Sequence, residues 1–428
     1  MLKSISKTCP EDWETKKVTE LIEFVSRGKS PKYTDNSGFK VINQKCIYWD
    51  TLNLDNAKFV EESTKEKWKE ELFVRQGDVL LNSTGTGTIG RANVINHNLE
   101  NYVIDSHVTL IRTNKELLNP FYFKNYLEFY PNQQKLAALC FTGSTNQVEL
   151  SKTQLLDFPL LTPPIKEQNK IAAILSSVDN AIEKTEEIIG QSEKVKKGLM
   201  QQLLTKGIRD ASLKETKYGI VPDDWEIKTV KDIAIKVTDG EHKTPKRSSS
   251  GFLLLSARNV KNGTLNLINV DYVEQEEFSK ITKRCHPEHG DILISCSGTI
   301  GNICVVPKDL DFALVRSVAL VKPDRRQVDS DYLMYVLQSP KLQSQMRMNL
   351  SQLAQANLFL RDINRLTIPL PTLEEQKKIV SILNEVSKKR NKEKEVLETL
   401  ITLKKGLMQD LLTGKVRVNV DEEEVVSS

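Results

Sequence analysis

The chain has 428 residues, more than one hydrophobic core comfortably holds, so its length favours two or more domains. Its content of 39% hydrophobic and 28% charged residues fits a soluble globular protein rather than a disordered or fibrous one, and no run approaches the ~18 apolar residues of a membrane span. A formal net charge of +4 is mild, so nucleic-acid binding has to come from local basic clusters.

The first half starts with an opening segment at residues 10–14, Pro-Glu-Asp-Trp-Glu, and continues as a long mixed region. Short apolar runs such as 79–81 and 108–111, separated by Gly, Asn and Asp, predict strands. Residues 122–139 are predicted to form one helix, and a proline-rich exit at 158–164 ends the region. We therefore expect a mixed α and β domain, called here a head.

A long helix is predicted after this head. Residues 167–209 begin with Glu-Gln-Asn-Lys-Ile and end with Lys-Lys-Gly-Leu-Met-Gln-Gln-Leu-Leu-Thr before Arg209. Apolar residues from Ile171 to Leu203, including Ile188 and Val195, recur at steps of three and four, which predicts an apolar seam interrupted near Thr185. A helix of ~40 residues spans ~60 Å, the scale of a domain.

The second half repeats this order of parts. An opening Pro-Asp-Asp-Trp-Glu at 222–226 is followed by a second mixed region, with a predicted strand at 319–321 and a predicted helix at 332–346, and by an exit at 368–371. Residues 375–417 then repeat the helix at a constant offset of 208 positions, with a seam that includes Leu403. A constant offset is expected of a spacer of fixed length.

Antiparallel pairing with each other is the simplest use of two such helices. The alternative is that each packs separately on its own head, but the seams are longer than the surface of one head. Between opening and exit the heads diverge, except for a Gly-Asp-Val/Ile-Leu strand and a shared Gly-Thr-Ile-Gly at 87–90 and 298–301. This pattern suits two recognition domains with different targets.

Apparent catalytic motifs lack the right context. Gly85–Gly90 reads G-x-G-x-x-G, the basis of an alternative function as a self-sufficient DNA methyltransferase or nuclease, but a predicted strand follows it where a helix is needed, so we expect a β-turn. Counted back from the shared glycines, Cys296 takes the place of Gly85 in the second half. The cluster at 285–289 lacks a second ligand pair for zinc. No C-x-x-C pair and no apolar signal run are present, so we expect reduced thiols, a cytoplasmic protein, and no metal or cofactor in this chain.

Candidate DNA contacts come from a basic loop that opens each head and from polar turn residues. Lys and Arg neutralise phosphates, whereas hydroxyl and amide groups bond base edges or phosphate. The alternative for each is a solvated loop or a turn cap. The candidates are Lys29, Lys32, Tyr33, Asn82, Ser83, Thr84, Arg91 and His107 in the first head, and Lys243, Thr244, Lys246, Arg247, Arg258, Asn259, Ser297 and Arg316 in the second. Amides at 141–147 and 352–357 also suit adenine recognition.

Taken together, the Pro-x-Asp-Trp-Glu openings, the shared strand and turn, the proline-rich exits and the repeated helix ends resemble the specificity subunit of type I restriction-modification enzymes over nearly the whole chain. The resemblance implies a non-catalytic subunit whose heads are target recognition domains that read the two halves of a split double-stranded DNA site. It also implies two methyltransferase subunits as partners, with S-adenosylmethionine bound to them, and motor-nuclease subunits for cleavage. A coiled-coil scaffold that binds proteins only is a third hypothesis.

The expected fold class is α+β: two mixed α/β target recognition domains separated by two long antiparallel coiled-coil helices, with a pseudo-twofold internal repeat. The expected boundaries are target recognition domain 1 at 1–160, spacer helix 1 at 161–209, a linker at 210–220, target recognition domain 2 at 221–368, spacer helix 2 at 369–417 and an acidic tail at 418–428.

Overall fold

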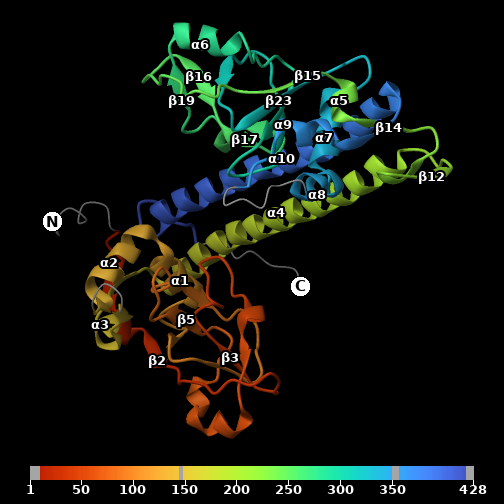
Figure 1. Ribbon diagram of the computed structural model, residues 1–428. Coiled ribbons are helices and arrows are strands. Elements are labelled where there is room, and N and C mark those ends of the chain that lie inside the picture. Colours follow the sequence, from red (N-terminus) through yellow and green to blue (C-terminus); the bar gives the residue numbers. More distant parts are fainter. Residues whose placement is uncertain (1–9, 144–147, 349–355, 421–428) are drawn as a thin grey trace. The chain divides into compact units, whose positions relative to one another are not determined.

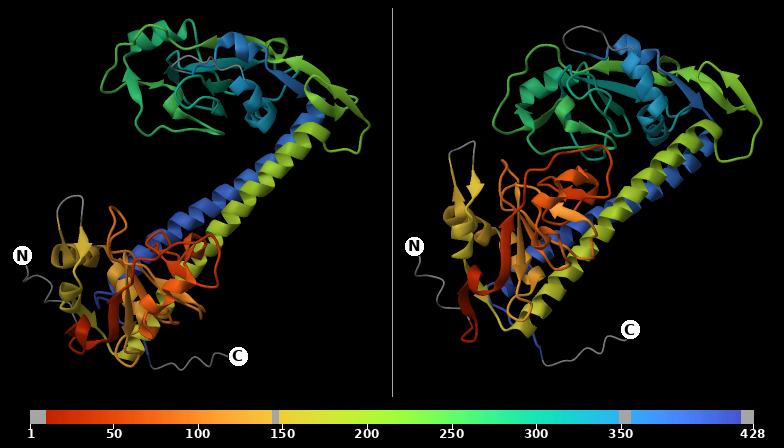
Figure 2. Two further views of the ribbon diagram at one scale, coloured as in Figure 1. Left: turned by 60° about the horizontal axis from the view of Figure 1, so that its bottom comes forward. Right: turned by 90° about the horizontal axis from the view of Figure 1, so that it is seen from below.

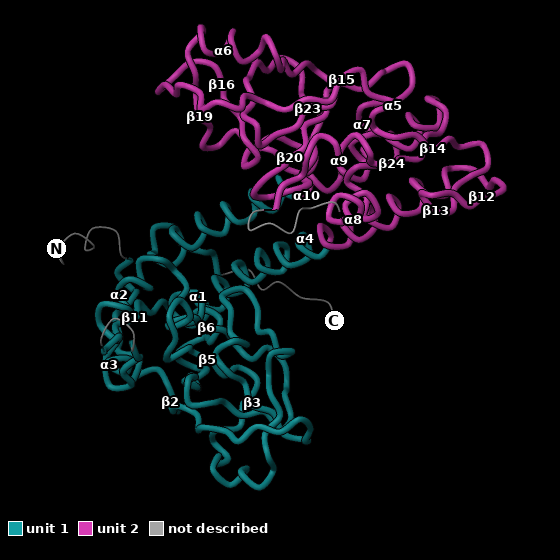
Figure 3. The backbone as a smooth tube through the Cα atoms, viewed as in Figure 1, with its two compact units in different colours: residues 1–187, 394–428 teal, residues 188–393 magenta. Residues whose placement is uncertain are grey.

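The computed structural model describes residues 10–143, 148–348 and 356–420. Figure 1 shows helices and sheets following one another along the chain, and the family expectation of a mixed α and β fold is confirmed. The chain divides into two compact units, unit 1 with residues 1–187 and 394–428, and unit 2 with residues 188–393 (Figure 3). Among the described residues, no helix is both long and apolar enough to cross a membrane.

Unit 1 is built on a four-stranded antiparallel sheet with a smaller sheet beside it. The strands of the larger sheet, in spatial order, are β2 (Ile22–Arg27), β8 (Val108–Thr113), β5 (Val79–Asn82) and β6 (Ala92–Val94). The smaller sheet has the order β4 (Lys58–Phe59), β3 (Lys40–Ile42) and β7 (Tyr102–Ile104). Two further antiparallel pairs are β1 (Glu14–Lys17) with β11 (Pro159–Thr162), and β9 (Phe141–Thr142) with β10 (Glu149–Leu150). Its short helices are η1 (Val18–Glu20), η2 (Leu54–Asn56), η3 (Glu62–Lys67), η4 (Glu70–Leu72), α1 (Pro120–Glu128), α2 (Tyr130–Cys140) and α3 (Lys152–Leu156).

Unit 2 repeats this topology. Its larger sheet has the order β15 (Ala234–Asp239), β23 (Val318–Pro323), β20 (Ile292–Ser295) and β21 (Ile303–Val305), and its smaller sheet has the order β19 (Asp271–Val273), β16 (Phe252–Leu255) and β22 (Phe312–Leu314). The remaining pairs are β14 (Glu226–Thr229) with β24 (Thr367–Leu370), β12 (Leu213–Thr216) with β13 (Gly219–Pro222), and β17 (Val260–Lys261) with β18 (Thr264–Leu265). Its short helices are α5 (Val230–Ile233), η5 (Ala257–Asn259), α6 (Gln275–Thr282), α7 (Ser330–Gln338), α8 (Pro340–Met348) and α9 (Leu360–Asn364).

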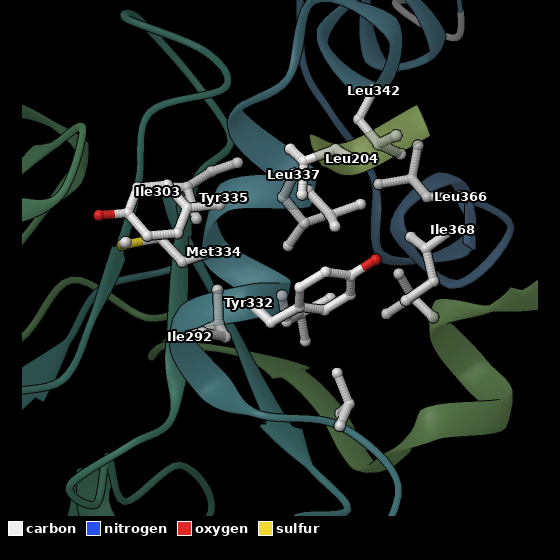
Figure 4. Packing of buried hydrophobic residues seen from close by; sticks show 14 of the residues in the cluster. Leu204, Ile292, Ile303, Tyr332, Met334, Tyr335, Leu337, Leu342, Leu366 and Ile368 are labelled. Carbon is white, nitrogen blue, oxygen red and sulfur yellow. The ribbon is translucent and has the colours of Figure 1, made fainter. Parts of the chain in front are cut away.

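The central strands are buried on both faces. In β5, Val79 and Leu81 join the core beneath the helices of unit 1, whereas Leu80 joins the core between the two sheets. Alternate residues of a strand point to opposite faces, which explains why this strand reads as an unbroken apolar run. In unit 2, Tyr332 of α7 and Ile368 of β24 occupy the equivalent helix-side core (Figure 4).

Two long helices, α4 (Ile165–Lys206) and α10 (Leu373–Leu411), contribute to both units and lie side by side in both views of Figure 2. In unit 1, Ile171 from the start of α4 shares a core with Met408 from the end of α10. In unit 2, Leu203 from the end of α4 shares a core with Ile379 from the start of α10. The helices are therefore antiparallel, as predicted. They fall within the ranges 161–209 and 369–417, whose assignment as separate spacer domains stays a prediction.

The seam of these helices differs from the prediction. Ile188, Val195 and Leu403 are 39%, 53% and 48% exposed, whereas Thr185 and Lys404 are buried. A straight α-helix has 3.6 residues per turn. Apolar residues at alternating steps of three and four therefore shift gradually around the helix surface over a long segment. Part of the predicted seam is therefore an exposed apolar surface.

Each predicted head helix is in fact two helices. The segment 122–139 breaks at Phe129, between α1 and α2, and the segment 332–346 breaks at Ser339, between α7 and α8. Pro131 and Pro340 lie in the first turn of the second helix of each pair, where a missing N–H does no harm but the preceding hydrogen-bond ladder has to stop.

A tryptophan, a buried glutamate and an arginine connect each head to a long helix. In unit 1, Glu167 of α4 accepts hydrogen bonds from Trp13 Nε1 at 2.9 Å and from Arg417 Nε at 2.7 Å and Nη2 at 2.8 Å. Arg417 also donates to both carboxylate oxygens of Asp12 at 2.8 Å. Unit 2 repeats the motif with Glu375 of α10, Trp225, Arg209 and Asp224. The opening segments and the helix ends recur together because they form this one structure.

Candidate nucleic-acid interface

The predicted basic loop of unit 1 follows directly after β2. Lys29 and Lys32 are exposed, and Tyr33 is 49% exposed, with the Lys58 ammonium 4.7 Å from the centre of its ring. A side chain at Gly28 would collide with the carbonyl oxygen of Ile104, so only glycine lets the loop leave the sheet here. The loop therefore places accessible cations and a hydroxyl at one end of the larger sheet.

Thr84 and His107 lie at the same end of this sheet. Thr84 Oγ1 is 2.7 Å from Nδ1 of His107, which is exposed. The backbone N–H of His107 donates to Asp105 at 2.8 Å, and burial raises the pKa of this carboxyl despite that hydrogen bond. The pair offers a hydroxyl and an imidazole to a ligand.

Arg91 is also placed near this end, but its guanidinium folds back on the turn. Nη2 donates to the carbonyl oxygen of Gly87 at 2.8 Å, and the group lies 5.7 Å from the centre of the Tyr48 ring. Its remaining donors stay free to bond a phosphate.

Three predicted contacts have structural roles instead. Asn82 and Ser83 are fully buried, Asn82 donating to the carbonyl oxygen of Gln44 and Ser83 lying 2.5 Å from the hydroxyl of Thr109. Asn259 is 1% exposed and accepts from the backbone N–H of Ser256. Polar residues after a strand can turn inwards to satisfy neighbouring backbone groups, and buried side chains cannot meet DNA. These three residues therefore leave the set of proposed contacts.

In unit 2 the corresponding loop is also exposed at Lys243, Thr244 and Lys246. The backbone N–H of Lys243 donates to Glu241 at 2.9 Å and lowers the pKa of that carboxyl. The loop is therefore ordered by its own backbone, and its ammonium groups stay directed to solvent.

Arg247 and Arg258 converge on one carboxylate. Arg247 Nε and Arg258 Nη2 lie 3.1 Å and 3.0 Å from Asp271, and both arginine side chains are about half exposed. One negative charge therefore positions two guanidinium groups, and the pair keeps an excess positive charge.

Ser297 and Arg316 line a cavity of about 650 Å³ at the end of the larger sheet of unit 2. Asp239 and His242 lie on its wall, and Phe359, 43% exposed, lies at the side formed by residues 357–361. The cavity combines donors, acceptors and an aromatic ring, the groups that recognise nucleobases.

The two basic loops were predicted to begin at Arg27 and at Asp239, but neither residue was among the individual predicted contacts. Each is the last residue of its strand and is followed by a glycine, Gly28 or Gly240. Any side chain added at these glycines would collide with the neighbouring backbone. The signal in the sequence was a glycine at the start of both loops, preceded by a positive charge in the first head and by a negative charge in the second. The amides predicted at 144–147 and 352–355 lie outside the described residues.

The described residues contain no cluster of His, Cys, Asp and Glu that could hold a metal ion. Gly85–Gly90 connects β5 to β6, an antiparallel pair, so it forms the predicted turn between strands. Strand β6, and not a helix, follows this turn, so the alternative of a self-sufficient methyltransferase loses its basis.

Comparison with known families decides the assignment of the whole chain. The model of the type I restriction modification DNA specificity domain matches residues 10–191 and 222–400. The chain belongs to this family. It is 28% identical over 426 residues to the putative type I restriction enzyme MjaX specificity subunit of Methanocaldococcus jannaschii, covering 96% of this chain and 95% of the relative. The MjaVIII specificity subunit of the same organism is 28% identical over 429 residues, covering 96% and 94%.

Two solved structures have the same fold. The S subunit of a type I restriction-modification system from M. genitalium superposes with a TM-score of 0.61 at 15% identity, covering 96% of this chain and 98% of that one. A second structure, concerned with complex assembly and conformational transition of the type I R-M system, gives a TM-score of 0.56 at 16% identity and covers 95% and 99%. Membership of the type I specificity family implies DNA binding and assembly with other subunits.

This type I specificity chain has a second surface of interest, on the long helices of unit 1. A cavity of about 890 Å³ lies between the α1–α2 junction, α4 and α10, with Ile182, Ile401 and Met408 among its apolar residues. Its α4 side also carries carboxylates, at Asp179, Glu183, Glu186 and Glu187. Lys404 and Lys405 line its α10 side, so the cavity has an apolar floor between acidic and basic side chains.

The two helices differ at equivalent lysines 208 positions apart. In unit 1, Lys404 lies 2.6 Å from Glu128 and 2.8 Å from Asp179. Burial by itself would lower the pKa of Lys404, but these two carboxylates outweigh it and the pKa is raised. The lysine is thus held charged inside unit 1.

In unit 2, Lys196 instead lies 5.0 Å from the centre of the Tyr335 ring. Burial, with a contribution from the charge of Arg390, lowers the pKa of Lys196 to about 8. The matched helices therefore present different electrostatic surfaces.

Proposed function

We propose that the chain is the DNA sequence-recognition subunit of a type I restriction-modification complex. Each unit carries one target recognition domain, which reads one half of a bipartite double-stranded DNA site, and α4 and α10 set the length of the unread gap. The supporting observation is one sheet topology present twice with unlike loop chemistry, attached to two helices of matched sequence. Two identical half-sites would not require unlike loops.

The proposed contacts divide into two classes. Lys29, Lys32, Lys243 and Lys246 are exposed cations that bond phosphates and give affinity without sequence preference. Tyr33, Thr84, His107, Arg91, Thr244, Arg247, Arg258, Ser297 and Arg316 carry hydrogen-bonding groups near the sheet ends that suit base edges or phosphate. Removing a phosphate contact should weaken binding to all sequences, whereas removing a base contact should relax one position of the motif.

A head exchange tests the modular part of this proposal. Residues 20–155 would be replaced by the equivalent head of another family member, and modified adenines would be mapped across the genome of a host that carries the methyltransferase partner. One half of the modified motif should change while the other half stays the same. A change in both halves would contradict modular reading, and the matched exchange of residues 230–365 controls for general damage.

Insertions into the helices test the gap. Four residues added after position 187 of α4 and four after position 393 of α10 lengthen both antiparallel helices by ~6 Å at matched points. Base pairs rise ~3.4 Å each, so the unread gap should grow by one or two base pairs. An unchanged gap would contradict the proposed role of the helices, and an insertion into α4 alone, which puts the pairing out of register, is the control.

The exposed apolar surface of α4 and α10 supports docking of two methyltransferase subunits, with S-adenosylmethionine bound to them and motor-nuclease subunits joining for cleavage. Leu403 is 48% exposed on α10, so replacing it with Asp leaves the fold of unit 1 largely undisturbed. Leu403→Asp should weaken co-purification with the methyltransferase subunit, whereas Leu403→Met should retain it because the apolar volume is conserved. Equal binding by both variants would place the docking surface elsewhere.

A further inference from the structure

The larger sheets of the two units can be superposed residue by residue from their hydrogen-bonded pairing. Arg27 at the end of β2 pairs with Thr109 of β8, and Asp239 at the end of β15 pairs with Ala319 of β23. The following glycines donate to equivalent carbonyl oxygens, those of Val108 and Val318. Arg27 and Asp239 therefore occupy the same position, and the charge there is reversed between the units.

The turn after the central strand follows the same register. Leu150 donates its backbone N–H to Ser83, and Leu358 donates its backbone N–H to Cys296, which makes Cys296 the equivalent of Ser83 and not of Gly85. The alignment from the shared glycines was wrong by two residues because the turn between β20 and β21 is two residues shorter than that between β5 and β6. Sequence alignment alone hides the equivalence.

In unit 1, the side chain of Arg27 fills the space between these elements. Its Nη2 donates to the carbonyl oxygens of Ser83 and Leu150 at 3.3 Å and 3.2 Å, and Nη1 donates to Glu149 at 3.1 Å. A guanidinium has five N–H donors, so donors remain unused, and the side chain is 32% exposed.

In unit 2, the shorter Asp239 does not cross that space. Cys296 and Leu358 are the equivalents of Ser83 and Leu150, which accept from Arg27 in unit 1. In unit 2 they line the cavity of about 650 Å³ together with Asp239. Asp239 accepts from His242 at 2.8 Å and from Arg284 at 2.5 Å. A carboxylate has about four acceptor positions, so these two hydrogen bonds leave acceptor capacity on a residue that lines the cavity.

We propose that this shared position sets one base preference in each half-site, Arg27 selecting guanine in unit 1 and Asp239 selecting a base with an exocyclic amino group, cytosine or adenine, in unit 2. The inference rests on the proposed function and adds the residues and the ligand chemistry. Guanine presents the O6 and N7 acceptors to a guanidinium, whereas cytosine and adenine present an amino donor to a carboxylate. Arg316 and Phe359 lie on the same cavity, where they offer a further donor and an aromatic surface to the same base.

The first test uses the unaltered chain in complex with its methyltransferase. Duplexes that carry 7-deazaguanine at single guanines of the half-site read by unit 1 lose only the N7 acceptor. At one guanine the affinity should fall about 10- to 150-fold, the range for one hydrogen bond to a charged group. The same analogue should have no effect on Arg27→Met, because this side chain keeps much of the aliphatic length but has no N–H to donate to N7. An equal loss in both proteins at every guanine would overturn the assignment of Arg27.

The second test maps modified sites for Asp239→Asn, which keeps the shape of the side chain and removes its charge. One position of the half-site read by unit 2 should relax while the other half-site stays the same. Glu276→Gln, on the exposed side of α6, is the matched loss of charge and should leave the motif unaltered. An unaltered motif in Asp239→Asn would overturn the assignment.

Two readouts keep the test informative. If Asp239→Asn does not fold, duplexes with N4-methylcytosine or N6-methyladenine in the half-site read by unit 2 probe the same amino group with the unaltered chain, and no loss at any position would overturn the assignment. Absence of any sequence-dependent modification by the unaltered complex would instead refute the proposed function, so the two failures are distinguishable.

Discussion

The buried carboxylate of Glu167 gives the sharpest stability prediction. It is 2% exposed and accepts three hydrogen bonds, one from Trp13 at 2.9 Å and two from Arg417 at 2.7 Å and 2.8 Å. In Glu167→Gln, one acceptor becomes an NH₂ group that faces these donors. A hydrogen bond to a charged group contributes about 1.5–3 kcal/mol, and removing one partner of a buried pair leaves the other unsatisfied.

Water offsets part of this loss because Arg417 is 45% exposed. We therefore expect the free energy of unfolding of unit 1 to fall by about 2–4 kcal/mol. For a domain of this size that lowers the melting temperature of unit 1 by about 4–16 °C. Two units need not unfold in one step, so amide hydrogen exchange should be followed separately in α1 and α7.

Protection should fall in α1 of unit 1 and stay unaltered in α7 of unit 2. Glu375→Gln is the matched control in unit 2, where the bonds from Trp225 and Arg209 are longer, at 3.3 Å and 3.1 Å, and a smaller loss is expected. The reasoning is refuted if Glu167→Gln leaves the protection of α1 unaltered, or if both variants reduce protection in the same unit.

Three further predictions concern single residues. The pKa of Lys196 in the folded chain is about 8, below its ordinary 10.5, so the folded state binds fewer protons than the unfolded state between these pH values. The stability of unit 2 should therefore rise with pH in this range, and Lys196→Met should abolish the rise in denaturant titrations. Gly28→Ala should destabilise unit 1 by about 1–3 kcal/mol, measured by exchange in β2, because the new methyl group collides with the carbonyl of Ile104. Gly198→Ala should stabilise α4 by about 0.5–1 kcal/mol in thermal unfolding, because nothing beyond the adjacent residues and the backbone of the helix itself lies within 4 Å of the new methyl group.

Each of these has its own control. Lys197→Met removes an exposed neighbouring charge and should retain the pH dependence. Gly38→Ala adds a methyl group whose nearest neighbour is at 3.5 Å, and it should be far milder than Gly28→Ala. A loss of stability in Gly198→Ala would contradict this prediction, because it would mean that the long helix makes a contact at Gly198 that a methyl group disrupts.

Much of the fold follows from local sequence patterns. The runs at 79–81 and 319–321 are strands because both faces of β5 and β23 are buried. The repeated helix ends are recognisable because Trp13 and Arg417 both bond to Glu167. The break at Phe129 was missed because apolar spacing continues across it, although Pro131 was a sufficient signal.

The site was less predictable than the fold. Asn82 and Thr84 are both polar residues near the end of the same predicted strand. The strand buries Asn82, whereas the turn places Thr84 beside the exposed His107. The equivalence of Arg27 and Asp239 depends on pairing across three strands, which no local pattern contains. Polar residues after a strand therefore predict where a site lies better than which side chains form it.

The division of unit 1 between residues 1–187 and 394–428 has a consequence for biosynthesis. Its core includes Met408 and Leu411, so unit 1 cannot complete its fold until the intervening segment 188–393 has been translated. At ~5–20 residues per second this delay lasts roughly 10–40 s. Chaperones have that interval in which to shield its exposed apolar surface, whereas unit 2, which is continuous in the chain, can complete its core as soon as it emerges.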